Sequence, residues 1–140
     1  MLFRTMEDIS DGVFRVLFSV IFVTAGAAHL VRPSVFVERL VAAPLGYLAS
    51  SLGSPTLLVV LSGIALLIGG LGLVLGYFTR AASLLLIAVL IPITVTVDLG
   101  HTNALGPLFK NVALLGGLVH FAVHGPGAYS VDSAVERLRW

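Results

Sequence analysis

The sequence contains no cysteine and has few charged residues. The missing thiols exclude disulfides, thiolate nucleophiles, cysteine-ligated iron–sulfur clusters and dithiol redox chemistry by this chain alone. Charged residues make up 11% of the 140 positions, whereas typical soluble domains contain about 25%. The net charge of +1 gives no support to nucleic-acid binding or to a strongly acidic partner.

Four long segments lack Asp, Glu, Lys and Arg altogether: residues 16–31, 40–79, 81–97 and 111–131. A helix that crosses a bilayer needs about 20 mostly apolar residues to span roughly 30 Å of hydrocarbon. The mean hydropathy of +1.07 agrees with several such helices in so short a chain. The sequence therefore predicts an all-α fold, a polytopic membrane four-helix bundle that forms a single domain over residues 1–140, with the lipid bilayer as its surroundings.

The expected membrane helices cover roughly residues 13–31, 56–78, 81–99 and 108–123. Pro33 should end the first helix, because proline disfavours helical geometry at the preceding residue. Pro92 should kink the third helix, because proline has no amide hydrogen to donate to the carbonyl of Ala88.

Two further segments lie outside the expected membrane helices. The connector of residues 34–55 is long and apolar, so we expect it in the membrane interface or packed over the end of the bundle. Residues 133–140 should form a short amphipathic tail helix, in which Ser133 and Glu136 have the spacing of a capping box.

The first helix has some features of a secretory signal. Arg15 precedes an apolar run, and Ala25-Gly26-Ala27 is similar to a small-residue cleavage site. However, the segment before the apolar run carries Glu7, Asp8 and Asp11, which suits a signal peptide poorly. We therefore expect this helix to be retained.

Arginine and lysine are distributed unequally between the two sides of the membrane. An even number of spans places both termini on one side, which would hold five basic residues against three on the other. Basic residues favour the cytoplasmic side, so the termini are predicted to be cytoplasmic. The first group comprises Arg4, Arg15, Arg80, Arg137 and Arg139, and the second comprises Arg32, Arg39 and Lys110.

Small residues recur at helical spacing in the second predicted helix, where Ala65, Gly69, Gly72 and Gly76 share one face. Lipid gives helices no hydrophobic reason to associate, so close approach through small side chains becomes the main attraction. The pattern predicts tight packing of this helix against a neighbour.

Polar residues near one end of the bundle form a candidate ligand site, which we call the outer layer: His29, Asp98, His101, Lys110 and Asn111. Ionisable groups inside a membrane tend to face the bundle interior and to mark functional sites. Histidine exchanges protons near neutral pH, so such a layer would hold a quinone headgroup and exchange protons with it. The alternative interpretation is an interfacial cluster that caps the bundle and anchors it.

A second set, the inner layer, comprises Arg15, His120 and His124 towards the opposite end. Arg15 is expected to extend its guanidinium to the lipid headgroups. Two histidines on one helix face do not complete a four-ligand zinc site. His29 lies at the other end of the bundle, so a bis-histidine haem is not expected either. We predict no metal and no haem.

Four segments resemble parts of the DoxX family of membrane proteins. Residues 18–29 (FSVIFVTAGAAH) are similar to the first helix of that family, where an Ala-Gly pair is followed by His or Lys. Residues 62–83 (SGIALLIGGLGLVLGYFTRAAS) resemble its glycine-rich second helix and Thr-Arg turn. Residues 110–117 and 125–132 (GPGAYSVD) resemble its last helix and the exit from that helix.

The resemblance implies a four-helix bundle in the plasma membrane of a bacterium or archaeon. It also implies quinone-linked oxidation of sulfur compounds, or membership of membrane oxidoreductase complexes that handle oxidative stress. One position departs from the family pattern. The family often has Glu three residues before the Gly-Gly pair, and here Leu66 stands there before Gly69-Gly70.

Three functions remain open at this stage. The first is a membrane subunit in quinone-linked redox chemistry, with electrons supplied by a partner chain because cysteine is absent. The second is a non-catalytic structural or assembly subunit of a membrane complex. A small transporter ranks third, because no inverted repeat or pair of broken helices is evident. We expect a homo-oligomer or another membrane redox subunit as partner, and no independent enzyme.

Overall fold

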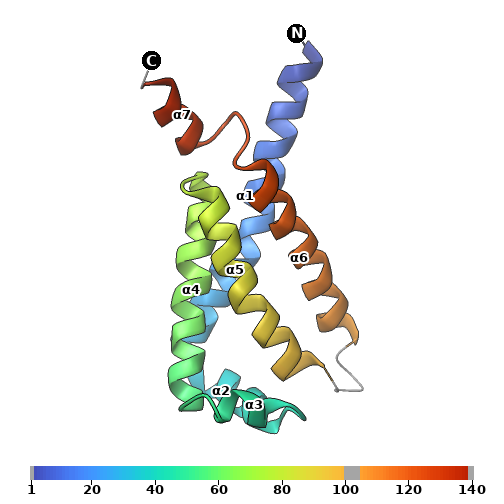
Figure 1. Cartoon of the computed structure of the whole chain (residues 1–140), viewed down its shortest axis with the longest axis vertical. Coiled ribbons are helices and arrows are strands. Elements are labelled where there is room, and N and C mark those ends of the chain that lie inside the picture. The colour runs from blue at the N-terminus through green and yellow to red at the C-terminus, as the bar shows by residue number, and fades with distance from the viewer. Residues whose placement is uncertain (1, 100–104, 139–140) are drawn as a thin grey trace.

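The computed structural model describes residues 2–99 and 105–138, which form a helical bundle (Figure 1). These described residues contain no β-strand, in agreement with the all-α prediction. In chain order the elements are α1 (Leu2–Val31), α2 (Pro33–Ala42), α3 (Gly46–Ser50), α4 (Pro55–Leu75), α5 (Thr79–Ile93), the π-helix η1 (Thr94–Asp98), α6 (Leu105–His124) and α7 (Val131–Arg137).

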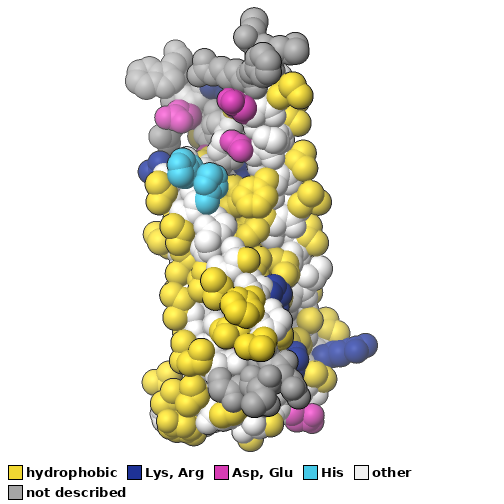
Figure 2. Space-filling view, turned by 90° about the vertical axis from the view of Figure 1, so that its right-hand side faces the viewer, with side chains coloured by type: hydrophobic (Ala, Val, Ile, Leu, Met, Phe, Trp, Pro, Cys, Tyr) yellow, Lys and Arg dark blue, Asp and Glu magenta, His cyan; other side chains and the backbone are white. Residues whose placement is uncertain are grey.

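Four helical segments within the described residues are long and apolar enough to cross a membrane: Thr5–Val31, Pro55–Leu75, Thr79–Asp98 and Leu105–His124. Helices suit this environment because each backbone N–H and C=O is satisfied within its own segment, where lipid offers no partner. Figure 2 shows hydrophobic side chains along the body of the molecule and acidic side chains near its two ends. The chain is a multi-pass membrane protein, as the sequence predicted.

Helix α1 is longer than the sequence predicted, since it begins at Leu2 rather than near residue 13. Its 30 residues correspond to about 45 Å at 1.5 Å per residue, which exceeds a hydrocarbon thickness of roughly 30 Å. Glu7, Asp8 and Asp11 lie before the apolar segment but within the helix, so the helix extends beyond the apolar segment. The other end lies where it was expected, at Val31.

The closest helix pair, α1 and α4, packs through glycines from both helices. A Cβ atom on Gly26 would lie 2.6 Å from the backbone nitrogen of Leu67, and a Cβ on Gly70 would lie 2.9 Å from the backbone nitrogen of Val23. A Cβ on Gly63 would meet that of His29 at 2.8 Å. These glycines allow backbone approach that any side chain would prevent.

The opposite face of α4 packs against α5, and this face carries the small residues noted in the sequence. The side chain of Leu86 packs against Gly69, and Ala82 packs against Gly72. Leu86 is fully buried in the core, which also contains Phe22 of α1 and Leu118 of α6. Helix α4 therefore has two glycine faces, and only the one towards α5 was identified from the sequence.

The connector between α1 and α4 forms two short helices, α2 and α3, which cross one end of the bundle (Figure 1). This agrees with the predicted segment packed over the bundle end. Pro33 occupies the first turn of α2, where its missing N–H costs no hydrogen bond. Both termini lie at the opposite end of the bundle (Figure 1).

The C-terminal tail corrects one prediction. Helix α7 begins at Val131, and its N-cap is Ser130, which forms a capping box with Ser133. The predicted pairing of Ser133 with Glu136 was wrong, because the backbone enters the helix three residues earlier than expected. Residues 139–140 of the predicted tail lie outside the described residues.

Replacing Gly26 by Ala should destabilise the bundle by about 1–3 kcal/mol, because the new methyl group would force α1 away from the backbone of α4. The matched control is Gly116→Ala in α6, where a Cβ would meet nothing within 4 Å. Thermal unfolding in detergent, followed by circular dichroism, measures both variants. Equal melting temperatures for the two would contradict the proposed close contact.

Candidate functional site

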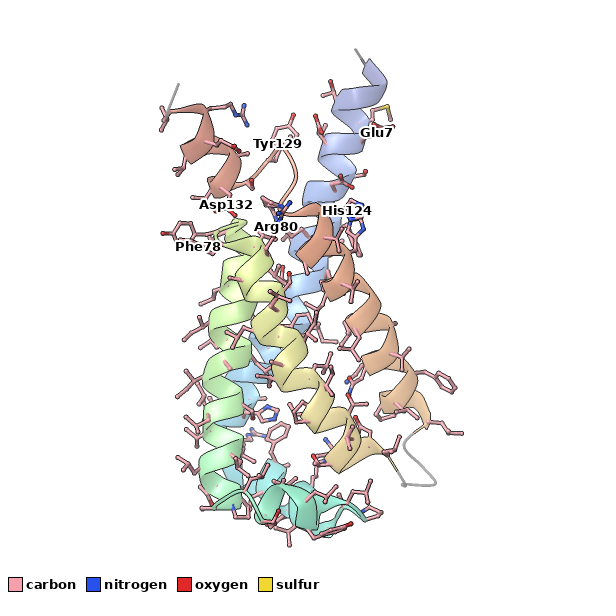
Figure 3. The ribbon with its side chains drawn as sticks, viewed as in Figure 1. Glu7, Phe78, Arg80, His124, Tyr129 and Asp132 are labelled. Atoms are coloured by element: carbon pink, nitrogen blue, oxygen red, sulfur yellow. The ribbon has the colours of Figure 1, made fainter. Side chains whose placement is uncertain are left out.

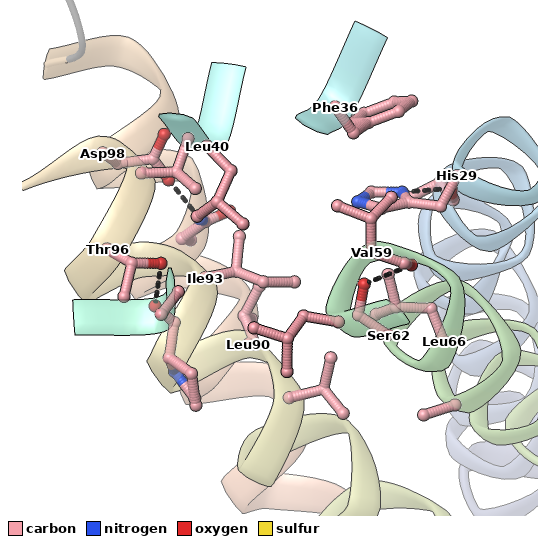
Figure 4. Close-up of a pocket in the computed structure, with 18 of the residues that line it drawn as sticks. His29, Phe36, Leu40, Val59, Ser62, Leu66, Leu90, Ile93, Thr96 and Asp98 are labelled. Carbon is pink, nitrogen blue, oxygen red and sulfur yellow. Dashed lines mark hydrogen bonds between the residues drawn. The ribbon is translucent and has the colours of Figure 1, made fainter. Parts of the chain in front are cut away.

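A cavity of about 590 Å³ lies in the half of the bundle that carries α2 and α3. Helices α1 to α6 and η1 all contribute side chains to its wall. Most of the wall is apolar, and Figure 4 shows Val59, Leu66, Leu90 and Ile93 around its centre. Leu66, three residues before the Gly69-Gly70 pair, is 3% exposed and forms part of this apolar wall.

His29 of α1 lines one side of the cavity. Its Nδ1 atom lies 2.7 Å from the carbonyl oxygen of Ala25, and its ring stacks on Phe36 with centroids 3.8 Å apart. A carbonyl oxygen only accepts, so Nδ1 carries a proton and Nε2 of the neutral ring is left as an acceptor. That second nitrogen lies on the cavity side of the ring (Figure 4).

Asn111 of α6 lies on another side of the cavity, within a hydrogen-bonded group. Its Nδ2 atom donates to Oδ2 of Asp98 at 2.7 Å and to Oγ1 of Thr94 at 3.0 Å. The Thr94 hydroxyl in turn donates to the carbonyl of Leu90 at 2.7 Å. Asn111 is 4% exposed, so this group fixes a polar patch inside an otherwise apolar region.

The π-helix η1 brings both Thr94 and Asp98 to α6. It starts two residues after Pro92, whose missing amide hydrogen interrupts the regular pattern of α5. A π turn is wider than an α turn, and such turns are frequent at functional sites. The sequence predicted a kink at Pro92, and the structure shows a change in helix type shortly after it, which the sequence did not indicate.

The outer layer is divided between two sides of the same cavity. His29 and Asp98 lie on opposite sides, as Figure 4 shows, with apolar side chains between them. Asn111 accompanies Asp98, and the exposed Lys110 also lines the cavity. His101 lies outside the described residues. The sequence did not indicate that Thr94 would bind Asn111, or that the ring of Phe36 would stack on His29.

The inner layer is not one cluster. His120 and His124 stack on each other, with ring centroids 4.4 Å apart, on an exposed face of α6. Arg15 instead turns towards the segment after α6, where its guanidinium donates to the carbonyls of Pro126 and Tyr129. Among the described residues, no group of three or more His, Cys, Asp and Glu side chains is arranged to hold a metal ion.

Arg15 is 3% exposed, so the prediction that it extends to the lipid headgroups was wrong. The physical reason is the path of the chain after α6. Gly125 and Gly127 adopt positive φ angles of 81° and 75°, which turn the backbone over α1. The carbonyls of this turn then accept hydrogen bonds from the two terminal nitrogens of the guanidinium, inside the protein.

Asp132 connects the segment after α6 to the turn between α4 and α5 by hydrogen bonds. Its carboxylate accepts hydrogen bonds from the backbone N–H groups of Phe78 at 2.9 Å and Thr79 at 3.2 Å, and its own N–H donates to the carbonyl of Gly76 at 3.0 Å. Phe78 has a positive φ of 49°, which is unusual for a non-glycine residue. Figure 3 shows Phe78 and Asp132 side by side at the end of the bundle that holds both termini.

Replacing Asp132 by Ala should release the C-terminal segment and cost about 1 kcal/mol, the usual value of a lost helix cap. Hydrogen exchange should accelerate at the amides of Phe78 and Thr79, which the carboxylate now protects. Glu136→Ala, on the exposed part of α7, is the matched control. Unchanged exchange in the Asp132 variant would show that the carboxylate does not hold the turn.

Comparison with known proteins supports the resemblance found in the sequence. The profile of the DoxX family matches residues 11–99. The inner membrane protein YqjF of Escherichia coli K12 is 27% identical over 147 aligned positions, which cover 98% of this chain and 99% of that protein. No solved structure matches the chain. The location of that relative agrees with the predicted plasma-membrane location. With four membrane helices and a profile match over more than half of its length, the chain belongs to the DoxX family.

Proposed function

We propose that this protein binds a quinone in the cavity and serves as the quinone-binding membrane subunit of a redox system. The observation that carries the proposal is the combination of apolar walls with separate polar groups on two sides of one cavity. Its volume of about 590 Å³ falls within the range of about 300–1,000 Å³ common for small-molecule sites. The family resemblance, which implies quinone-linked chemistry, points the same way.

The polar groups suit the two oxygens of a quinone headgroup. Lys110 carries a cationic donor that would bind a quinone carbonyl. His29 holds Nδ1 against a backbone carbonyl, so the neutral form of the ring would offer Nε2 as acceptor for a quinol hydroxyl. The apolar wall between the two sides, which includes Leu66, would contact the ring and the first part of the tail. Histidine would exchange the proton, because its charge changes near neutral pH.

The complete reaction requires a second redox protein. Reduction of a quinone to a quinol takes up two electrons and two protons. This chain has no cysteine for dithiol or iron–sulfur chemistry, so the electrons would come from a partner that carries a redox cofactor. In the proposal, His29 passes protons between the headgroup and the outside, and the partner supplies or removes the electrons.

The termini are proposed to face the cytoplasm, because the sequence places five of its eight basic residues on that side. The cavity lies in the other half of the bundle, with α2 and α3 (Figure 1). The site would therefore exchange protons on the outer side of the membrane.

The test is titration calorimetry with decylubiquinone on the protein in lipid nanodiscs. Replacing His29 by Ala should weaken binding about fivefold, since a hydrogen bond contributes about 1 kcal/mol and about 1.4 kcal/mol corresponds to a factor of ten. The substitution keeps the Cβ atom that packs against Gly63 and removes only the ring. The matched control is His124→Ala, at an exposed position outside the cavity lining.

Equal weakening in the two histidine variants would contradict a specific role for His29. If the unmodified protein in nanodiscs binds no decylubiquinone, the quinone proposal fails. The structural alternative would then be examined through membrane partners that co-purify with the chain. A partner retained in the absence of quinone binding would favour an assembly subunit.

A further inference from the structure

We infer that the ligand reaches the cavity sideways from the bilayer, through an opening between α4 and α5, and that its hydrocarbon tail remains in this opening. The inference rests on the proposed function and deepens it, because it identifies the ligand as a lipid-dissolved amphiphile. A water-soluble metabolite would need an opening to the aqueous phase.

The cavity wall is continuous from the bundle core to the membrane-facing surface. On the core side, Leu66 is 3% exposed and Leu90 is 5% exposed. On the outer side the same cavity is lined by Leu61, which is 52% exposed, and by the exposed Ala88 and Pro92. The two sets lie on α4 and α5. Between these helices, one apolar surface therefore connects the interior with the lipid-facing exterior.

The opening exists because α4 and α5 touch closely at only one end. Near their connecting turn, Gly69 receives Leu86 and Gly72 faces Ala82. From there the two helices diverge towards α2 and α3, as Figure 1 shows. In the divergent part, Ala65 and Ala88 line the cavity from the two helices. Their single methyl groups are too short to close the space.

The depth of the opening indicates lipid as the source of the ligand. Leu61 is six residues from the first residue of α4, or about 9 Å along the helix. Pro92 is likewise six residues from the end of the span Thr79–Asp98. Both lie within segments that cross the hydrocarbon layer, where water is scarce.

Helix α3 lies across the end of this opening and is itself apolar. Leu48 and Leu52 of this region are exposed and line the same cavity. The hydroxyl groups of Ser62 and Thr96 are also in the wall. They donate hydrogen bonds to backbone carbonyl oxygens one turn earlier in the chain, at 2.8 Å and 2.7 Å. These two hydroxyls are therefore already engaged, which suits a hydrocarbon tail beside them rather than a polar chain.

The experiment uses the full-length protein in vesicles of phosphatidylcholine and phosphatidylglycerol. A fraction of the phosphatidylcholine carries a photoreactive diazirine in its acyl chain. After irradiation, mass spectrometry identifies the labelled residues. We expect labels on the interior residues Leu66 and Leu90, in addition to the outward-facing leucines.

Replacing Ala88 by Trp should fill the mouth and abolish the interior labels. Leu61→Trp, on the other side of the mouth, is a second variant that should also abolish the labels on the interior residues. The matched control is Ala113→Trp, at an exposed position on α6 outside the cavity lining, which should keep the interior labels. Equal melting temperatures of the variants would show that each one folds.

Labels confined to outward-facing residues in the unmodified protein would overturn the inference. Interior labelling by a water-soluble diazirine, without labelling by the acyl-chain probe, would overturn it as well and would indicate an aqueous entrance. This readout is independent of quinone binding. If the interior is labelled from the lipid but decylubiquinone does not bind, the lateral opening stands and the quinone proposal fails.

Discussion

The close approach of α4 to both of its neighbours is the contact on which the rest of the structure depends. Glycines on one face meet the backbone of α1, and glycines on the other face receive α5. In a membrane such contact must come from van der Waals packing, because the surrounding lipid is as apolar as the side chains. The contact with α5 ends where the glycines end. Beyond it, the helices diverge and leave the space that becomes the cavity.

The two ends of the bundle have different roles. At the end with the termini, Arg15 and Asp132 bind backbone groups of the C-terminal segment and of the α4–α5 turn. These hydrogen bonds hold the C-terminal segment over this end of the bundle and close it. At the other end, His29 and Asn111 line a space large enough for a ligand. The same kinds of residue therefore support structure at one end and candidate chemistry at the other.

Leu66 gives the centre of the cavity its apolar character. The family resemblance implies a carboxylate at this position in many members, and here an apolar side chain forms the wall of the cavity. A buried carboxylate would require a partner or a proton. With leucine, the centre of the cavity needs neither, and proton exchange would depend on the groups at its sides. An apolar centre suits the apolar ligand of the proposed function.

The sequence by itself determined the number of membrane helices, most of their ends, the segment across the bundle end and four residues that surround the cavity. Long uncharged segments fix these features, because a charge inside hydrocarbon is too costly to leave unpaired. Only the tertiary structure decided where Arg15 points, that η1 is a π-helix, and that the outer layer is divided between two sides of a cavity. These features depend on contacts between residues far apart in the chain, such as Arg15 with Pro126 and Thr94 with Asn111, which no local pattern specifies.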